Sequence, residues 1–312
     1  MRITVIGHFC LDLIAHADGS ETRGYGGSFF ALTALANLLK PRDVVRPVFG
    51  VGNGDYDALL ERLKVYPNVD TSGIYRFSGP TNSVRLMYDD RQQRIECSKD
   101  VAEPVPWKRI RPHLETDMVL VNMISGLDIT LETMDEIRME VRESHVPVYL
   151  DVHCLALGFR EDHTRYYRPL AEWRRWLFML HAVQANEEEC RALTPDGLDE
   201  QKLADQILAL GTKVLIVTRG RNGCTVFVDE RKRTTRFDVE GIRAGEMVDP
   251  TGCGDVFGAA YCARHLHSKN VAASVEFANR VAAFNAQSPG STGIDALASF
   301  RVEEPIAEEQ RP

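Results

Sequence analysis

The chain has 312 residues, of which 44% are hydrophobic and 26% charged, and its formal net charge at pH 7 is −8. These values are typical of a globular protein with a sizeable core, and the net negative charge argues against a nucleic-acid partner. No apolar run approaches the ~20 residues needed to cross a bilayer, so no membrane partner is expected.

Seven cysteines are scattered along the chain, and no Cys-x-x-Cys pair occurs. An odd, dispersed set argues against a disulfide framework and against a zinc site, and it favours a reducing compartment. The first residues read as a strand and lack the layout of a signal peptide. We therefore expect a cytoplasmic protein.

The first third of the chain mixes two kinds of strand. The run Arg2 to Gly7 predicts a buried strand, but the Gly-x-Gly-x-x-Gly that a dinucleotide-binding fold would need does not follow it. Residues 83–97 read as two strands around a polar turn, which predicts a hairpin outside a parallel sheet. The other elements expected here are strands at 13–18, 44–51 and 69–75 and helices at 28–39 and 56–63.

From Met118 onward, strands and helices alternate regularly. We expect strands at 118–122, 146–151, 181–184, 213–218, 224–228 and 233–237. We expect helices at 130–144 and 170–178, two helices between 184 and 210, one from 256 and one at 271–287. Such alternation predicts an α/β fold, with a mostly parallel sheet flanked by helices on both faces. We treat residues 1–312 as one domain, with a small β lid formed by roughly residues 12–24 and 80–98.

A polar, glycine-containing loop runs directly into an apolar helix at Val248 to His267. The N–H groups of Gly252, Cys253 and Gly254 at the helix start would form an anion site. Asp255 would repel a bound phosphate, unless it takes the proton of a hydroxyl to which that phosphate is transferred. The alternative is that Asp255 merely caps the helix.

The string Asp-Pro-Thr-Gly-Cys-Gly-Asp at 249–255 resembles the signature of the PfkB, or ribokinase-like, carbohydrate kinases, usually Asp-Thr-x-Gly-Ala-Gly-Asp. The resemblance implies a ribokinase-like fold with a small β-sheet lid. It also implies that Asp255 is the catalytic base and that Gly252, Cys253 and Gly254 form the anion hole. Cys253 stands where the family usually has alanine.

Further residues follow the family pattern on the acceptor side. The resemblance implies that Asp12 accepts hydrogen bonds from sugar hydroxyls and that Gly26 and Gly27 contact the substrate. Asn122 ends a predicted strand, where α/β folds bind ligands, although such residues often only terminate the strand. Ala31 stands where the family often has a sugar-contacting Asn, which removes one polar contact.

The donor side is expected in the second half of the chain. Asn186 and Glu189 either form a helix-capping box or, as the resemblance implies, act with Mg²⁺ and phosphate, Glu189 through water. The nucleotide-binding candidates are Asn186, Thr218, Gly220, Gly223 and Asn279. Asp249 and Thr251 are candidates for a monovalent-cation site such as K⁺.

The expected activity is ATP- and Mg²⁺-dependent phosphoryl transfer to a hydroxyl of a sugar or sugar-like alcohol. No P-loop and no protein-kinase motif is present. Three alternatives remain open: a nucleoside kinase using Phe29 and Phe30 for stacking, a sugar-phosphate kinase using Arg85, Arg91 and Arg94, and a catalytically silent regulator. The lid is also a candidate homodimer surface.

Overall fold

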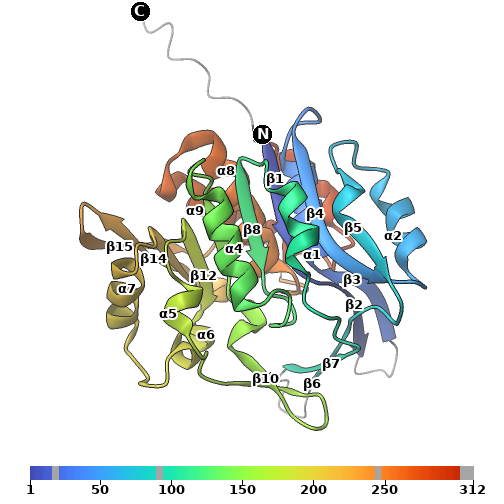
Figure 1. Cartoon of the computed structure of the whole chain (residues 1–312), viewed down its shortest axis with the longest axis horizontal. Helices are drawn as coiled ribbons and strands as arrows, with labels where there is room; N and C mark the ends of the chain where they lie inside the picture. The colour runs from blue at the N-terminus through green and yellow to red at the C-terminus, as the bar shows by residue number, and fades with distance from the viewer. Residues whose placement is uncertain (16–20, 89–93, 243–246, 303–312) are drawn as a thin grey trace, which may run out of the picture.

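The computed structural model describes residues 1–15, 21–88, 94–242 and 247–302 (Figure 1). A large twisted sheet runs through the molecule, and a second, smaller sheet lies below one side of it in the view of Figure 1. Among the described residues, none of the helices has both the length and the apolar character that crossing a bilayer requires.

The large sheet has nine strands in the order β15-β14-β13-β12-β9-β8-β1-β4-β5. The strands from β13 to β5 pair in parallel, and β14 and β15 pair antiparallel at one edge. Their bounds are β1 Arg2–Ile6, β4 Val44–Gly52, β5 Ile74–Phe77, β8 Met118–Asn122, β9 Val148–Asp151, β12 Ala182–Asn186, β13 Val214–Thr218, β14 Gly223–Glu230 and β15 Arg233–Glu240.

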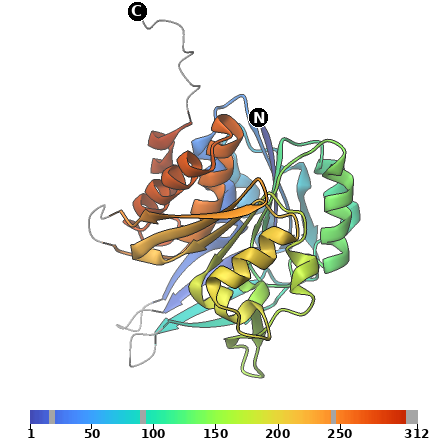
Figure 2. The ribbon, with the colours of Figure 1, turned by 90° about the vertical axis from the view of Figure 1, so that its left-hand side faces the viewer.

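Helices cover both faces of this sheet, as Figure 2 shows with the sheet seen between two helical layers. Alternate residues of β1 point to opposite faces: Ile3 and Val5 belong to the core under α1, α8 and α9, and Ile6 belongs to the core under α4 and α7. The bounds are α1 Ser28–Leu38, α2 Tyr56–Leu63, α3 Trp107–Ile110, α4 Leu131–Arg142, α5 Trp173–Trp176, α6 Glu187–Leu193, α7 Glu200–Ala209, α8 Cys253–Ser268 and α9 Val271–Asn285.

The small sheet has the strand order β3-β2-β6-β7, with bounds β2 Phe9–Ala15, β3 Glu21–Gly27, β6 Ser83–Tyr88 and β7 Arg94–Lys99. It contains the expected hairpin, because β6 and β7 pair antiparallel. The prediction of an α/β fold, with a mostly parallel sheet, helices on both faces and a small additional sheet, is confirmed in the described part of the chain.

Strand order reverses between β1 and β8. The chain continues from β1 to β4 and β5 on one side, and β8, β9, β12 and β13 follow on the other. In open α/β sheets, ligands bind at the carboxyl ends of the strands beside such a switch point. Asn122 ends β8 at this position, so the topology directs attention to this edge of the sheet.

Several elements differ from those expected. The strand expected at 69–75 is β5, which begins at Ile74, and the helix expected at 170–178 is the single turn α5. Gly26 and Gly27 end strand β3 instead of forming a turn. The polar loop expected after β9 contains a two-stranded hairpin, β10 Leu157–Phe159 and β11 Arg165–Tyr167.

Candidate active site

The loop before α8 takes a conformation that depends on glycine. Gly252 has a φ of 76°, and a Cβ at this position would overlap the ring of Phe30. The Cys253 N–H donates to the Pro250 carbonyl at 3.2 Å, so its amide is already engaged. The first-turn amides on either side of it, those of Gly252 and Gly254, belong to the set that has no partner within the helix.

Asp255 lies in the first turn of α8 and is 8% exposed. The Asn122 side-chain Nδ2 donates to its Oδ1 at 2.7 Å. This bond joins the end of β8 to the start of α8 across the switch point. Because the amide nitrogen faces the carboxylate, the Asn122 Oδ1 points elsewhere, and it is buried without a hydrogen-bond partner among the described residues. Asn122 is therefore placed to orient the carboxylate.

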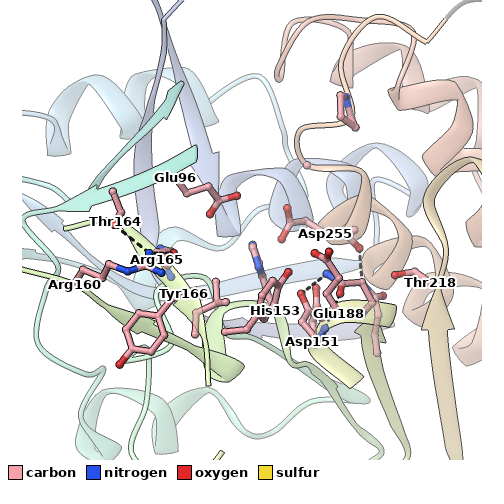
Figure 3. A pocket seen from close by; sticks show the side chains of 18 residues that line it. Glu96, Asp151, His153, Arg160, Thr164, Arg165, Tyr166, Glu188, Thr218 and Asp255 are labelled. Atoms are coloured by element: carbon pink, nitrogen blue, oxygen red, sulfur yellow. Dashed lines mark hydrogen bonds between the residues drawn. The ribbon is translucent and has the colours of Figure 1, made fainter. Parts of the chain in front are cut away.

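A cavity of about 610 Å³ opens in front of Asp255 (Figure 3). Its walls come from β7, the segment between β9 and β11, the start of α6, the end of β13 and the loop before α8. The lining residues are Glu96, Asp151, His153, Leu157, Arg160, Thr164, Arg165, Tyr166, Tyr167, Gln184, Asn186, Glu188, Glu189, Thr218, Pro250, Gly252, Gly254 and Asp255.

Two further carboxyl groups in the cavity wall have raised pKa values. Burial raises the pKa of Glu189 to about 8. Burial also raises the pKa of Asp151 well above its usual value, with the charges of Glu189 and Asp255 adding to the effect. The three acids therefore disfavour one another's ionised forms, and a cation at this point would stabilise all three.

The Asn186–Glu189 pair forms a complete capping box at the start of α6. The Glu189 N–H donates to Asn186 Oδ1 at 2.8 Å, and the Asn186 N–H donates to Glu189 Oε2 at 2.8 Å. The Asn186 Nδ2 also donates to Glu189 Oε1 at 2.6 Å. The capping interpretation is thus confirmed. Both residues also line the cavity, so a role toward metal or phosphate stays a prediction.

The acceptor-side residues Asp12, Gly26 and Gly27 lie outside the lining of the cavity. Asp12 pairs with Gly24 across β2 and β3, and a Cβ on Gly26 would overlap its carboxylate. The Cys10 thiol donates to Asp12 Oδ1 at 3.4 Å. In this structure, Gly26 makes room for the Asp12 side chain.

The nucleotide-binding candidates separate into two groups. Thr218, at the end of β13, lines the cavity, whereas Gly220, Gly223 and Asn279 do not. A Cβ on Gly223 would overlap the Val239 carbonyl of β15, and the Asn279 Nδ2 donates to the Glu240 carbonyl at 2.8 Å. Gly223 therefore allows β14 to approach β15 closely, and the Asn279 hydrogen bond ties α9 to the end of β15.

Asp249 and Thr251, the candidates for a monovalent-cation site, lie in the signature loop, residues 249–255. Asp249 ties this loop to the segment that follows α9. Asp249 Oδ1 accepts from the Thr251 N–H at 2.9 Å, and its Oδ2 accepts from the Gly290 N–H at 2.8 Å. In the described part of the chain, no group of three or more His, Cys, Asp or Glu side chains is arranged to hold a metal ion. The K⁺ site therefore stays a prediction.

One residue assignment from the sequence needs correction, and a second one stays a prediction. Phe29 and Phe30 are each 1% exposed and belong to the core between α1 and α8, so they are not available to stack on a nucleoside. Arg85 in the small sheet forms an ion pair with Glu21 at 3.4 Å. Arg91 and the side chain of Arg94 lie outside the described part of the chain, so the role of these arginines toward a sugar phosphate stays a prediction.

The sequence reading missed the β10–β11 hairpin, which supplies Arg160, Thr164, Arg165, Tyr166 and Tyr167 to the cavity. The hairpin contacts the small sheet at two points. Cys97 and Thr164 form an isolated antiparallel β-bridge, and the Ser98 N–H donates to the His163 carbonyl at 3.1 Å. Each strand has three residues, which is too short for an alternating pattern to stand out. The polar residues between the two strands are the one local feature from which a hairpin turn could be predicted.

Comparison with known proteins bears on this geometry. Residues 164–296, which include the hairpin strand β11 and the signature loop, match the model of the pfkB family carbohydrate kinases. The resemblance to the PfkB/ribokinase-like family is confirmed. The curated relatives include a cytidine kinase of Thermococcus kodakarensis, 24% identical over 86% of this chain and 90% of that protein. They also include a ribokinase of Bacillus subtilis, 28% identical over 94% of this chain and 95% of that protein.

Solved structures share the fold of this chain at low sequence identity. A pyrophosphate-dependent kinase in the ribokinase family superposes with a TM-score of 0.76, 18% identity and coverage of 92% of this chain and 96% of the other. Ribokinase from Giardia lamblia gives 0.74, with 16% identity and coverage of 96% and 97%. The matched family and both curated relatives are kinases, which supports phosphotransferase activity.

Proposed function

We propose that the chain is an ATP-dependent kinase that transfers the γ-phosphoryl group to a hydroxyl of a sugar or sugar-like alcohol. The observation that carries the proposal is the Asp255 carboxylate, held at 2.7 Å by Asn122 at the N-terminus of α8 and facing a cavity of about 610 Å³. A helix N-terminus favours an anion, and a carboxylate beside it suits an incoming hydroxyl.

In the proposed reaction, the acceptor oxygen forms a bond to the γ-phosphorus while the bond from that phosphorus to the β-phosphate oxygen breaks. The hydroxyl proton passes to Asp255, and ADP leaves. Bond breaking leads in such transfers, so the proton is lost late and a weak base suffices. The amides at the start of α8 would stabilise the charge on the transferred group.

Mg²⁺ would supply charge neutralisation between the donor phosphates and the acidic wall of the cavity. Glu189 and Asp151 suit this role, because burial and mutual repulsion raise their pKa values in the absence of a cation. Glu189 would act through water, since both of its oxygens accept hydrogen bonds from Asn186. Thr218 would border the donor.

A nucleoside acceptor is the second candidate, favoured by the cytidine kinase relative and by two tyrosines in the cavity wall. Tyr166 and Tyr167 are 39% and 43% exposed, and exposed aromatic rings can stack on a base. They would provide the stacking surface for the base that the buried rings of Phe29 and Phe30 cannot provide. The pyrophosphate-dependent structural neighbour also makes pyrophosphate a donor worth assaying.

The test is a matrix of donors and acceptors. The purified chain is assayed with ATP or pyrophosphate against sugars, polyols, sugar acids, sugar phosphates and nucleosides, and the phosphorylated product is measured. We expect Mg²⁺- and ATP-dependent product with a sugar-like alcohol. Nucleosides as the preferred acceptors would support the second candidate. Binding of ATP without product from any acceptor would support a silent regulator and contradict the proposal.

A further inference from the structure

The two arginines of the β10–β11 hairpin that line the cavity, Arg160 and Arg165, are held by neutral groups. The Arg165 Nε donates to Ser98 Oγ at 2.7 Å, and its Nη1 donates to the Ser125 carbonyl at 3.3 Å. The Arg160 Nη1 donates to Thr164 Oγ1 at 3.4 Å and to the Arg165 carbonyl at 3.2 Å. Among the described residues, neither guanidinium has a carboxylate within ion-pair distance. Two positive charges in the cavity wall are therefore not compensated by an ion pair there.

These contacts also fix where the Arg165 charge sits. Ser98 belongs to β7 of the small sheet, and Ser125 follows β8 of the large sheet. Arg165 thus bridges the two sheets, and its guanidinium carbon lies over the ring of Phe159, 5.0 Å from the ring centre. Three contacts of this kind restrict a long side chain to one position. A positioned charge of this kind suits a specific ligand.

Arg165 lies near the residues expected to bind the acceptor. Burial raises the pKa of the Cys10 thiol, the charges of Asp12 and Asp255 raise it further, and Arg165 is the group that lowers it. Cys10 therefore lies within electrostatic reach of all three residues. Because Cys10 contacts Asp12 directly, the Arg165 charge acts on the same region as the predicted acceptor-binding carboxylate.

The arginines also lie away from the predicted donor side. Figure 3 shows Arg160, Thr164 and Arg165 on one side of the cavity and Thr218 on the other, with Asp255 between them. A donor phosphate at the start of α8, beside Thr218, leaves the hairpin side to the acceptor. The arginines would therefore meet the part of the acceptor that is remote from the reacting hydroxyl.

Carboxylates in the same cavity limit further which acceptors fit its charge distribution. Glu96 on β7 faces the cavity between Arg165 and Asp255 in Figure 3, and a carboxylate accepts hydrogen bonds from hydroxyls but repels anions. An acceptor with hydroxyls toward Glu96 and Asp255 and a negative group toward the hairpin matches this distribution.

We infer that Arg165, with Arg160 beside it, binds an anionic group of the acceptor, so that the substrate is a phosphorylated or carboxylated sugar. This inference rests on the proposed kinase function and names its acceptor class. The phosphate and the carboxylate share the chemistry that a guanidinium recognises. A neutral sugar or nucleoside would leave the two charges without a partner.

The test compares matched acceptors that differ in charge. Product formation with ATP is measured for fructose against its 1- and 6-phosphates, ribose against ribose 5-phosphate, and glucose against gluconate. We expect the wild-type chain to prefer one charged member over its neutral partner by at least about tenfold in kcat/KM. The phosphate pairs and the gluconate pair distinguish the two sources of the anion. Equal or better use of the neutral members would overturn the inference.

Variants then assign the preference to Arg165. Arg165→Met should lower kcat/KM for the charged acceptor by about 10- to 100-fold, chiefly through KM, and lower the neutral partner's value much less, so that the charged-to-neutral ratio falls. Arg165→Lys should retain most of the preference, because it keeps the charge. The matched control is Arg168→Gln, which removes an arginine bonded to the Leu157 carbonyl on the same hairpin but outside the cavity. It should leave the charged-to-neutral ratio unchanged.

Each contrary result is informative. An Arg165→Met variant that loses activity equally toward both members of a pair would show a structural role and overturn the inference. If Arg165→Met does not fold, the wild-type preference and the Arg165→Lys ratio still decide. Turnover of neutral acceptors that depends on Asp255 would contradict the anionic acceptor while leaving the kinase function intact. Absence of turnover with every acceptor and donor would contradict the kinase function itself.

Discussion

Asp255 combines two features that oppose each other in simple electrostatics. The positive end of the α8 dipole favours the ionised form of a carboxylate in its first turn and makes it a weaker base. The low exposure of Asp255, 8%, acts against the ionised form, because little water reaches the charge. The Asn122 amide donates to Oδ1 of Asp255, which lines the cavity. In the proposed reaction, Asp255 therefore acts mainly by position, and a late proton transfer tolerates its weakness as a base.

Replacing Asp255 by Asn should abolish most of the activity. The amide has a similar shape but cannot take the proton, so kcat should fall by at least about 100-fold, while KM for the acceptor changes little. Steady-state kinetics with the best acceptor of the panel gives both constants. Turnover close to that of the wild-type chain would return Asp255 to the role of a helix-terminal residue.

Asn122→Asp should shift the pH profile. A second carboxylate at the 2.7 Å contact with Asp255 would make the two groups share a proton. The pKa of the pair is then raised, so the acidic limb of the kcat/KM profile should move to higher pH. The measurement is kcat/KM from pH 5 to 9, with Asn122→Ser as the uncharged control. A profile that overlays the wild-type one would show that the Asn122 contact does not orient a reacting group.

Glu189→Gln separates capping from metal binding, because Gln also completes a capping box. The pKa of Glu189 is about 8 in the folded chain and 4.5 as an ordinary glutamate. A raised pKa stabilises the fold fully below about pH 4.5, and this contribution is lost as pH rises toward 8. The wild-type free energy of unfolding should therefore fall over this window more than that of the variant.

Magnesium should reverse the same trend. If Mg²⁺ acts through Glu189, millimolar MgCl₂ with ATP should raise the midpoint of thermal unfolding of the wild-type chain at pH 8 more than that of Glu189→Gln. The variant should also need more Mg²⁺ for half-maximal activity. Identical Mg²⁺ responses in the two proteins would leave Glu189 with its capping role alone.

Among the elements, the loop-to-helix junction at Gly252 has the tightest packing requirement. The positive φ of 76° and the Phe30 ring both exclude a side chain there. Gly252→Ala should therefore lower the free energy of unfolding by more than the ~1–2 kcal/mol that a left-handed residue costs. Gly197→Ala is the matched control, because Gly197 has a φ of 56° with nothing near its Cβ position.

Urea unfolding of the two glycine variants measures the difference. Adding Phe30→Val to Gly252→Ala should recover part of the loss, because the smaller side chain makes room for the new methyl group. Equal losses of unfolding free energy in Gly252→Ala and Gly197→Ala would mean that the Phe30 side chain moves aside at little cost. In that case α1 would not fix the position of the signature loop.

How far the sequence predicts an element depends on the length of its pattern. The bounds of β8 and α2 agree with the expected 118–122 and 56–63, since each is a continuous apolar or amphipathic run between turn residues. The sequence does not reveal the hairpin β10–β11, because it contacts β7 through the Cys97–Thr164 pairing, and these two residues are 67 positions apart (164 − 97). The loop at 249–255, by contrast, is recognisable from the sequence, because its glycines and carboxylates form one short continuous string before an apolar helix.

Across the whole molecule, the candidate site depends on elements that no local pattern connects. Asn122 and Asp255 are separated by 133 positions and meet through sheet topology. The sequence suggested both residues, but the hydrogen bond between them follows from the parallel order that brings β8 under α8. Arg165 joins the two sheets in the same way, through Ser98 and Ser125. Tertiary contacts of this kind are not encoded in any short stretch.

Because the cavity contacts both sheets and the start of α8, ligands that fill it should stabilise the whole fold. A ligand that binds the folded chain alone adds about 2.7 kcal/mol at 100 times its Kd. With Asp255→Asn, which retains the cavity but should not turn over, the charged acceptor together with Mg²⁺ and ATP should raise the melting temperature. Each alone should raise it less, since the acceptor and the donor would occupy adjoining parts of one cavity. A melting temperature unchanged by every combination would contradict binding at this site.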